Sequence, residues 1–316
     1  MMSVTALYDL YKRKKSKDLA DGSFTLKDKA VSLFCEFAGD IPAVDVTEDM
    51  AEDFRLWLHN EERGKVSANI YLSNIKPLFA WLAAGRQPYI PFNPFADIRR
   101  YRTERMVRPI FEPEEINRLL KMADARWKVI VLLGAEHSLR RGEVLNLCRD
   151  DIEGRWLHVR AKKKTATTWP WTIKNHAQTL LPISPRLAQA LPDLQRIVPV
   201  AQPYLIVPPD RYRRMLHLQA ENSLTPDDRG KPYSNFNRAW RQLQRRASVP
   251  LRPYKDLRTT FACALRLGGM GADDVSEQMR HSSLAVTQAY LRHGAYTELA
   301  GKTLDALQLF YGVVPP

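Results

Sequence analysis

The spacing of apolar residues near the amino terminus restricts the fold more than any other feature of this sequence. Leu26, Ala30, Leu33, Phe34 and Phe37 recur at i, i+4, i+7, i+8 and i+11, which places them on one face of a helix. Two later stretches repeat this spacing, each after a residue that favours a helix start. Their apolar stripes are Met50, Phe54, Trp57 and Leu58 after Thr47, and Tyr71, Leu72, Ile75, Phe79 and Leu82 after Ser67. Three amphipathic helices that must cover one another predict a helical domain over residues 23–98.

Charged segments lie on both sides of this predicted domain. Residues 1–22 form a basic extension with a short helix expected over Leu7–Lys17. The sequence leaves open whether this helix lies on a partner or is a solvated terminus. Residues 99–109 contain five arginines and no apolar periodicity, which predicts a linker. A solvated hinge and contact with a phosphate backbone are compatible interpretations of these arginines.

A second domain, residues 110–316, mixes helical patterns with a short sheet. Pro113 precedes two glutamates, a combination typical of a helix start. Polar or aromatic residues alternate with apolar ones over residues 156–161, which predicts a strand, and Thr179–Ile183 is its expected partner. Helices are expected over Trp127–Glu136 and Arg141–Cys148, from Pro185 onward around a short extended piece at Tyr204–Val207, and over 234–247, 255–268, 271–280 and 284–293. The predicted fold class is mainly α, with a small β-sheet in the carboxy-terminal domain.

The excess of basic residues indicates the class of partner. Lysine and arginine exceed aspartate and glutamate by 48 − 35 = 13 over 316 residues. A chain this basic attracts polyanions, and nucleic acid is the expected one. Apolar runs stay far below the roughly 20 residues that cross a bilayer, and the first residues do not resemble a secretory signal. We therefore expect a cytoplasmic, nucleoid-associated protein with no membrane partner.

The cysteines and histidines do not suggest a metal site. Cys35, Cys148 and Cys263 are far apart in apolar surroundings, and the sequence has no Cys-x-x-Cys pair. The histidines lack the spacing of metal ligands. We expect buried reduced thiols, no metal and no cofactor.

Three segments of the second domain combine the groups that metal-free phosphoryl transfer requires. They are SLRRGEVLNL at 138–147, KDLRTTFACAL at 255–265 and RHSSLAVTQAYLRH at 280–293. Each has an ordinary structural interpretation when taken alone, as a surface or core helix. Together they supply arginine forks for phosphate oxygens, a tyrosine hydroxyl as nucleophile and lysines able to protonate a leaving alkoxide.

In this order, the segments resemble the tyrosine recombinase family, which includes the phage integrases. That family carries an arginine in a stretch like GLRxSE, a lysine in a β-turn, [H/K]xxR, GHSS and a tyrosine in TTxxY. The corresponding stretches here are HSLRRGE, a candidate lysine, KDLR, RHSS and VTQAY. The resemblance covers nearly all of the chain. It implies a helical SAM-like core-binding domain followed by a tyrosine recombinase catalytic domain.

The resemblance assigns a role to each matching residue. Arg140 and Arg258 match the two arginines, and Glu143 matches the acidic residue that supports the first. His281 matches the third basic position, and Tyr290 matches the nucleophile.

Three positions depart from the family pattern or leave alternatives. Lys255 stands where most members have histidine, which suits it to hold charge near the phosphate rather than act as a base. Arg280 replaces the usual glycine before the histidine. Lys174 is the expected β-turn lysine and general acid, eight residues before Pro182. Its alternatives are Lys162, Lys163 and Lys164, directly after the first strand.

The function implied by the resemblance is site-specific DNA recombination through a 3′-phosphotyrosyl intermediate, without metal or ATP, by a recombinase or integrase of a mobile element. Four protomers are expected to act on two double-stranded DNA sites through a Holliday junction. The alternatives are a catalytically silent DNA-binding protein on the same fold and a chromosome-dimer resolvase. The expected DNA-binding residues are Arg99, Arg100 and Arg102 in the linker and Arg238, Arg241 and Arg245 in the basic helix.

Overall fold

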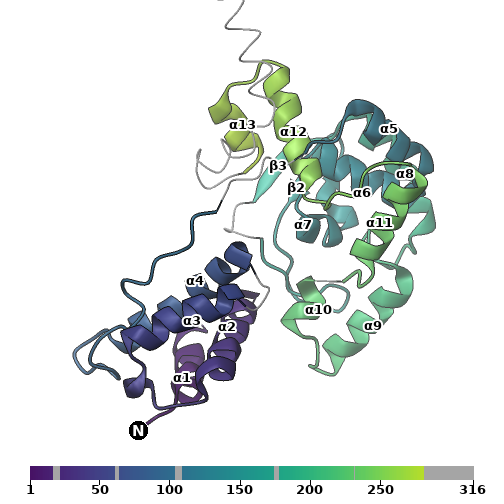
Figure 1. The fold of residues 1–316 in the computed structure, drawn as a ribbon. Helices are drawn as coiled ribbons and strands as arrows, with labels where there is room; N and C mark the ends of the chain where they lie inside the picture. The colour runs from purple at the N-terminus through teal and green to yellow at the C-terminus, as the bar shows by residue number, and fades with distance from the viewer. Residues whose placement is uncertain (17–21, 61–63, 104–108, 174–177, 231, 281–316) are drawn as a thin grey trace, which may run out of the picture. The chain divides into compact units, whose positions relative to one another are not determined.

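The computed structural model describes residues 1–16, 22–60, 64–103, 109–173, 178–230 and 232–280. The chain divides into two units, Met1–Arg105 and Met106–Pro316. In Figure 1 the colour of the ribbon changes with residue number, so the helices of each unit can be identified by colour and label. The first unit contains α1 (Val4–Lys15), α2 (Gly22–Ala38), the 3-10 turn η1 (Ala43–Asp45), α3 (Glu48–Asn60) and α4 (Gly64–Leu82). No helix within the described ranges is both long and apolar enough to span a bilayer.

Phenylalanine side chains hold the first unit together. Phe34 of α2 makes edge contacts with Phe54 of α3 and Phe79 of α4, with ring centroids 5.2 and 5.9 Å apart. All three side chains are fully buried. Such aromatic edge contacts add to the free energy of burying the rings themselves. The three helices predicted from the apolar stripes therefore pack as expected.

The predicted helix starts agree with the structure to different degrees. The Thr47 hydroxyl accepts a hydrogen bond from the Met50 N–H at 3.1 Å, which confirms the predicted cap of α3. α4 begins at Gly64, three residues before the expected start at Ser67. α2 likewise begins at Gly22, before the expected cap at Thr25.

The first helix is part of the core of the first unit, unlike the peripheral basic extension expected for residues 1–22. Val4, Leu7, Tyr8 and Tyr11 of α1 are buried at i, i+3, i+4 and i+7. The Tyr8 hydroxyl donates to Asp28 of α2 at 2.9 Å. The basic residues gather in the last turn of α1, where cations favour the helix dipole. The apolar spacing therefore outweighs the charge in placing this segment.

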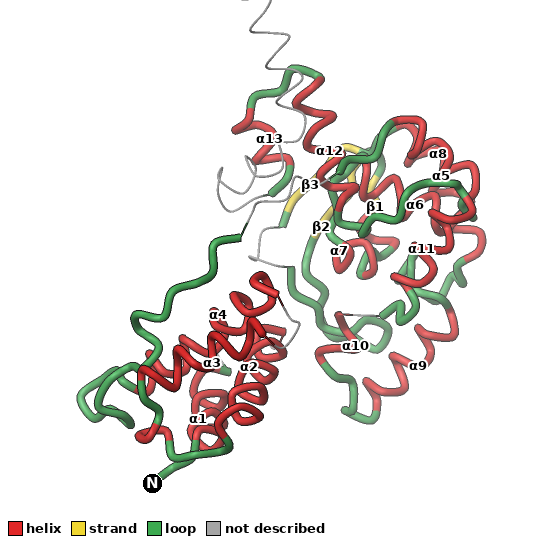
Figure 2. The backbone as a smooth tube through the Cα atoms, in the orientation of Figure 1, coloured by secondary structure: helices red, strands yellow, loops and turns green. Residues whose placement is uncertain are grey.

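Within its described residues, the second unit consists mainly of helices and loops with a sheet of three short strands, as Figure 2 shows. Its elements are α5 (Pro113–Met122), α6 (Ala125–Ala135), α7 (Arg141–Leu145), the 3-10 turn η2 (Arg149–Asp151), β1 (Ile152–Glu153), β2 (Trp156–Val159), β3 (Thr179–Pro182), α8 (Pro185–Ile197), α9 (Pro209–Ala220), α10 (Pro226–Gly230), α11 (Phe236–Arg246), α12 (Asp256–Leu267) and α13 (Ala272–Gln278). The fold class predicted from the sequence is confirmed. The helix expected over 284–293 lies outside the described residues.

The sheet is antiparallel in the order β1-β2-β3. β2 and β3 pair as predicted, with Leu157 opposite Leu181, and both side chains are buried. The two-residue strand β1 was not expected from the sequence. The expected extended piece at Tyr204–Val207 is no regular strand, but its residues are all buried and Tyr204 bridges to Cys148.

Helix α6 forms the centre of the second unit. Residues 129–133 of α6 are buried on every side, which accounts for the unbroken apolar run in the sequence. At its amino-terminal end, Trp127 stacks on Trp240 of α11 with ring centroids 5.9 Å apart. α5, α8 and α12 pack on the same helix.

The close approach of α6 to the start of α12 depends on Gly134. A Cβ atom at this position would lie 2.8 Å from both the Tyr254 hydroxyl and Leu257 Cδ1. Tyr254 is buried, and its hydroxyl donates to the Ile130 carbonyl at 2.8 Å, so its ring has little freedom to move. Gly134 therefore sets how near α12 lies to α6.

We expect Gly134→Ala to lower the free energy of unfolding by about 1–3 kcal/mol, because the added methyl group overpacks a filled interior. Urea titration of the full chain measures the change. Gly142→Ala is the matched control, because its Cβ would meet only the Trp171 ring, at an ordinary 3.6 Å. Equal stability of the two variants would contradict a close contact at Gly134.

Candidate active site

The turn between α6 and α7 places the first motif arginine. Ser138 adopts a left-handed backbone conformation with φ of 57°, and Arg140 is the N-cap of α7. Glu143 supplies the acidic half of a capping box, because its Oε2 accepts the Arg140 N–H at 2.8 Å. Its Oε1 accepts the Arg140 Nη1 at 3.0 Å. One buried carboxylate therefore fixes both the backbone and the side chain of Arg140.

Arg258 reaches the same turn from α12. Its side chain is buried, Nη1 donates to the Ser138 carbonyl, and Nη2 donates to the Met279 carbonyl at 3.0 Å. Both acceptors are backbone carbonyl oxygens. Ser138 lies in the turn between α6 and α7, and Met279 is the C-cap residue of α13. Arg258 thus connects the loop before α7 with the residue that ends α13.

Arg280 enters the same cluster, which sequence reasoning did not anticipate. Its side chain is 5% exposed, and Nη2 donates to the Ser138 carbonyl at 2.9 Å and forms an ion pair with Glu143 Oε2, also at 2.9 Å. The Arg280 carbonyl in turn accepts Arg140 Nη2 at 3.3 Å. Burial lowers the pKa of Arg280, while the carboxylate of Glu143 opposes this shift.

The cluster favours an anionic ligand. Arg140 and Arg280 share the Glu143 carboxylate, so the pair carries more positive charge than the acid they bind. The Arg140 side chain is 27% exposed, so it is only partly covered by the protein. A phosphate diester supplies negative oxygens that suit such a fork. The structure therefore brings Arg140, Glu143 and Arg258 together as the sequence predicts.

The two basic residues of the KDLR motif, Lys255 and Arg258, differ in how far their side chains are exposed. Lys255 is the N-cap residue of α12, and its side chain is exposed, whereas that of Arg258 is buried. His281 and Tyr290 lie outside the described residues, as does Lys174.

Among the alternative lysines, Lys162 is held by an internal ion pair. Its Nζ lies 2.7 Å from Asp151 Oδ2, and the two side chains are 9% and 1% exposed. The same ammonium donates to the Arg160 carbonyl at 3.0 Å. Lys163 and Lys164 are exposed. A lysine with this many internal acceptors has a structural role, which separates Lys162 from the two that follow it.

The long connection between β2 and β3 is anchored to the arginine-bearing helix. Trp169 is fully buried and stacks on Tyr204 with ring centroids 3.7 Å apart. Its Nε1 donates to Asn146 Oδ1 at 2.9 Å, and Asn146 is the C-cap of α7. The sequence suggested only a polar loop here, and its tryptophans were the available signal for an anchor.

All six arginines expected to contact DNA have exposed side chains. They are Arg99, Arg100 and Arg102 in the first unit, and Arg238, Arg241 and Arg245 in the second. In the first group, Asn69 fixes the intervening Tyr101 by accepting its N–H at 2.8 Å and donating to its carbonyl at 2.9 Å. In the second, the spacing i, i+3, i+7 places all three on one face of α11.

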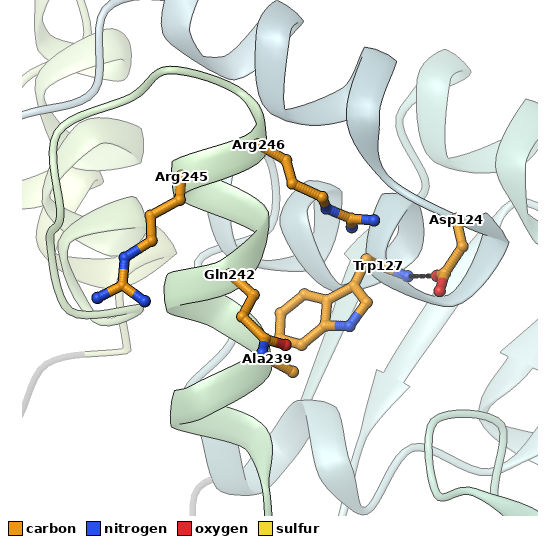
Figure 3. Close-up of a pocket in the computed structure, with 6 residues that line it drawn as sticks. All are labelled: Asp124, Trp127, Ala239, Gln242, Arg245 and Arg246. Atoms are coloured by element: carbon orange, nitrogen blue, oxygen red, sulfur yellow. Dashed lines mark hydrogen bonds between the residues drawn. The ribbon is translucent and has the colours of Figure 1, made fainter.

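A hollow of about 430 Å³ lies beside α11, apart from the arginine cluster. Figure 3 shows Arg246 extending toward Trp127 and Asp124, whereas Arg245 points away from them. Asp124 is already engaged as the N-cap of α6. This hollow lacks the motif residues. Within the described ranges, acidic, cysteine and histidine side chains form no group of three suited to a metal ion.

Family models match both units of the chain. The phage integrase family matches residues 109–296, and the phage integrase SAM-like domain matches residues 3–102. A curated relative, the tyrosine recombinase XerC-like protein of Caldanaerobacter subterraneus subsp. tengcongensis, is 25% identical over 200 residues. The match covers 58% of this chain and 50% of the relative, so the chain spans about half the length of the curated relative it matches.

Several solved structures share the fold. The Tn1549 transposon integrase in complex with a circular intermediate DNA has a TM-score of 0.71 and 16% identity, covering 97% of this chain and all of that chain. A lambda integrase tetramer bound to a Holliday junction has a TM-score of 0.62 and 15% identity, covering 90% of this chain and 78% of that chain. At these identities the likeness shows the fold alone. The predicted SAM-like and catalytic domain architecture is confirmed.

We expect Lys162→Ala to lower the free energy of unfolding by roughly 1–3 kcal/mol, because Asp151 then loses a charged hydrogen-bond donor inside the protein. Arg160 still contacts Asp151 at 2.9 Å, which limits the loss. Urea titration measures the effect, and Lys163→Ala is the control, with no loss expected. A Lys162→Ala protein as stable as the parent would show that the ion pair does not hold this turn.

Proposed function

Because the chain belongs to the phage integrase family of tyrosine recombinases, we propose that it is a site-specific recombinase that cleaves and rejoins DNA through a 3′-phosphotyrosyl intermediate. The observation that carries this proposal is the buried cluster of Arg140, Glu143 and Arg258. Two chain segments far apart in the sequence, the start of α7 and α12, build it, and it has the charge to hold a phosphate.

In the proposed reaction, Arg140 and Arg258 bind the non-bridging oxygens of the scissile phosphate. Negative charge grows on these oxygens in the transition state, where preorganised donors are most effective. The Tyr290 oxygen gives up its proton to water and forms a bond to phosphorus as the bond to the 5′-oxygen breaks. A lysine donates a proton to that oxygen, and attack by a second 5′-hydroxyl reverses these steps on a new strand.

We assign supporting roles to the remaining motif residues. Glu143 fixes Arg140 through two contacts, so it acts through that arginine rather than on DNA. Lys255 and His281 hold charge near the phosphate. Lys174 is the proposed general acid, with Lys163 and Lys164 as alternatives. Lys162 is the weakest alternative, because Asp151 and the Arg160 carbonyl already engage its ammonium.

The exposed arginines are the proposed contacts to the DNA backbone. Arg238, Arg241 and Arg245 follow one another along α11, so one helix face offers three cations to successive phosphates. A second group consists of Arg99, Arg100 and Arg102. The two hydrogen bonds between Asn69 and the Tyr101 backbone hold their segment against the first unit. Contacts of this kind supply affinity without reading sequence.

We further propose that the substrate is double-stranded DNA of a mobile element and that four protomers act on two paired sites. The similarity to the Tn1549 transposon integrase supports the mobile element. A chromosome-dimer resolvase is the second candidate, which the XerC-like relative favours. The arginine cluster disfavours a DNA-binding protein without catalytic activity, because binding alone does not require a carboxylate that holds Arg140 by both its backbone and its side chain.

Tyr290→Phe should abolish covalent capture of DNA entirely, because the variant lacks the nucleophilic oxygen and keeps the ring. The measurement uses a nicked suicide substrate that carries an attachment site, followed by denaturing electrophoresis. Mapping the DNA-linked peptide after proteolysis identifies the residue that carries the link.

Tyr296→Phe is the matched control and should form the adduct at the parental rate, because Tyr296 lies six residues beyond the motif. DNA binding should survive in both variants. An adduct in Tyr290→Phe, or a peptide linked at Tyr296, would overturn the assignment of the nucleophile. No adduct in the parent protein, despite DNA binding, would favour a silent DNA-binding protein.

Lys174→Ala should slow cleavage by about 10²–10⁴, the usual contribution of a general acid. A 5′-phosphorothiolate substrate should restore the rate, because a thiolate leaves without a proton. The same pair of substrates applied to Lys163→Ala and Lys164→Ala compares the alternatives. Sulfur rescue of one of these two variants, with none for Lys174→Ala, would move the assignment to that lysine.

A further inference from the structure

Arg280 occupies a backbone position that suits glycine. Its φ of 55° lies in the left-handed region, where a side chain meets steric strain. A residue kept there against that strain needs a compensating interaction. Its guanidinium has one, because it is buried against the turn that carries Arg140.

The contacts of Arg280 run to both of the motif arginines. It meets Arg140 twice, through the Glu143 carboxylate that they share and through its own carbonyl oxygen. It meets Arg258 through the Ser138 carbonyl, to which both side chains donate. Arg280 therefore contacts an acceptor of each motif arginine, the Glu143 carboxylate of Arg140 and the Ser138 carbonyl of Arg258.

These contacts constrain Glu143 in a way that Arg140 alone does not. Oε2 of Glu143 accepts the Arg140 N–H and lies 2.9 Å from the Arg280 Nη2, while Oε1 accepts from the Arg140 side chain. Without Arg280, only the two contacts from Arg140 hold the carboxylate, so its terminal torsion and the Arg140 guanidinium are less restrained. Displacement of a catalytic group by about 1 Å costs on the order of 10²-fold in rate.

We propose that Arg280 is a positioning residue that holds Arg140 and Arg258 in register for one phosphate. This rests on the proposed function of the cluster. Arg280 acts through Glu143 and the Ser138 carbonyl, and its burial at 5% exposure keeps it away from bulk solvent. A glycine at this position would adopt the positive φ without strain. The arginine accepts that strain and adds contacts to Glu143 and to the Ser138 carbonyl.

Two variants distinguish the effect of the Arg280 guanidinium contacts from the effect of its strained backbone. Arg280→Met keeps a long unbranched side chain and the strained backbone but removes the donors, whereas Arg280→Gly removes the donors and the strain together. Both should bind DNA as the parent does and cleave bound DNA about 10²-fold more slowly. Ser248→Gly is the matched control, because it relieves a left-handed residue with φ of 51° outside the cluster. It should cleave at the parental rate.

A second readout does not depend on cleavage. Modification of Arg140 by phenylglyoxal, followed by mass spectrometry of the free protein, should accelerate in both Arg280 variants and stay unchanged in Ser248→Gly. Thermal unfolding verifies that each variant is folded. Parental Arg140 reactivity in folded Arg280→Met and Arg280→Gly would overturn the positioning role. Absence of DNA cleavage in the parent would instead count against the proposed function, while the labelling still tests the Arg280 contacts.

Discussion

Two acceptors, the Ser138 carbonyl and the Glu143 carboxylate, set the geometry on which the candidate active site depends. Arg258 and Arg280 donate to the first, and Arg140 and Arg280 bind the second. Guanidinium groups repel one another, and burial strengthens that repulsion, so shared acceptors are needed to keep them together. The packing of α12 on α6 brings the Arg258 side chain to the Ser138 carbonyl, and the turn before α7 exposes that carbonyl to it.

The parts of the site with short-range chemistry could be predicted from the sequence. The family resemblance predicted that Glu143 supports Arg140, and their spacing of three residues suits a contact within one helical turn. Arg258 was placed by its motif. The role of Arg280 could not be predicted, because its contact with Ser138 spans 142 positions of the chain. Its burial depends on the turn that ends α13, which no local pattern reveals.

Similar reasoning accounts for the agreements and differences in the fold. Periodic apolar stripes predicted α2, α3 and α4, because each helix buries one face. The basic residues of α1 obscured a shorter stripe that begins at Val4. Strand β1 has only two residues, too few for any periodicity, and exists because β2 pairs with it. The anchoring of Trp169 against Tyr204 likewise needs a partner 35 residues away.

The acceptor shared by Arg258 and Arg280 belongs to the main chain, and this affects how such a site can change during evolution. A substitution cannot delete a peptide carbonyl, so the oxygen at position 138 persists whatever side chain stands there. What a substitution can lose is the backbone conformation that aims it, since Ser138 has a φ of 57°. Glycine, asparagine and aspartate tolerate that conformation, whereas β-branched residues do not. Substitution at this position is thus limited by the backbone torsion, in addition to the buried hydroxyl that donates to the Met279 sulfur.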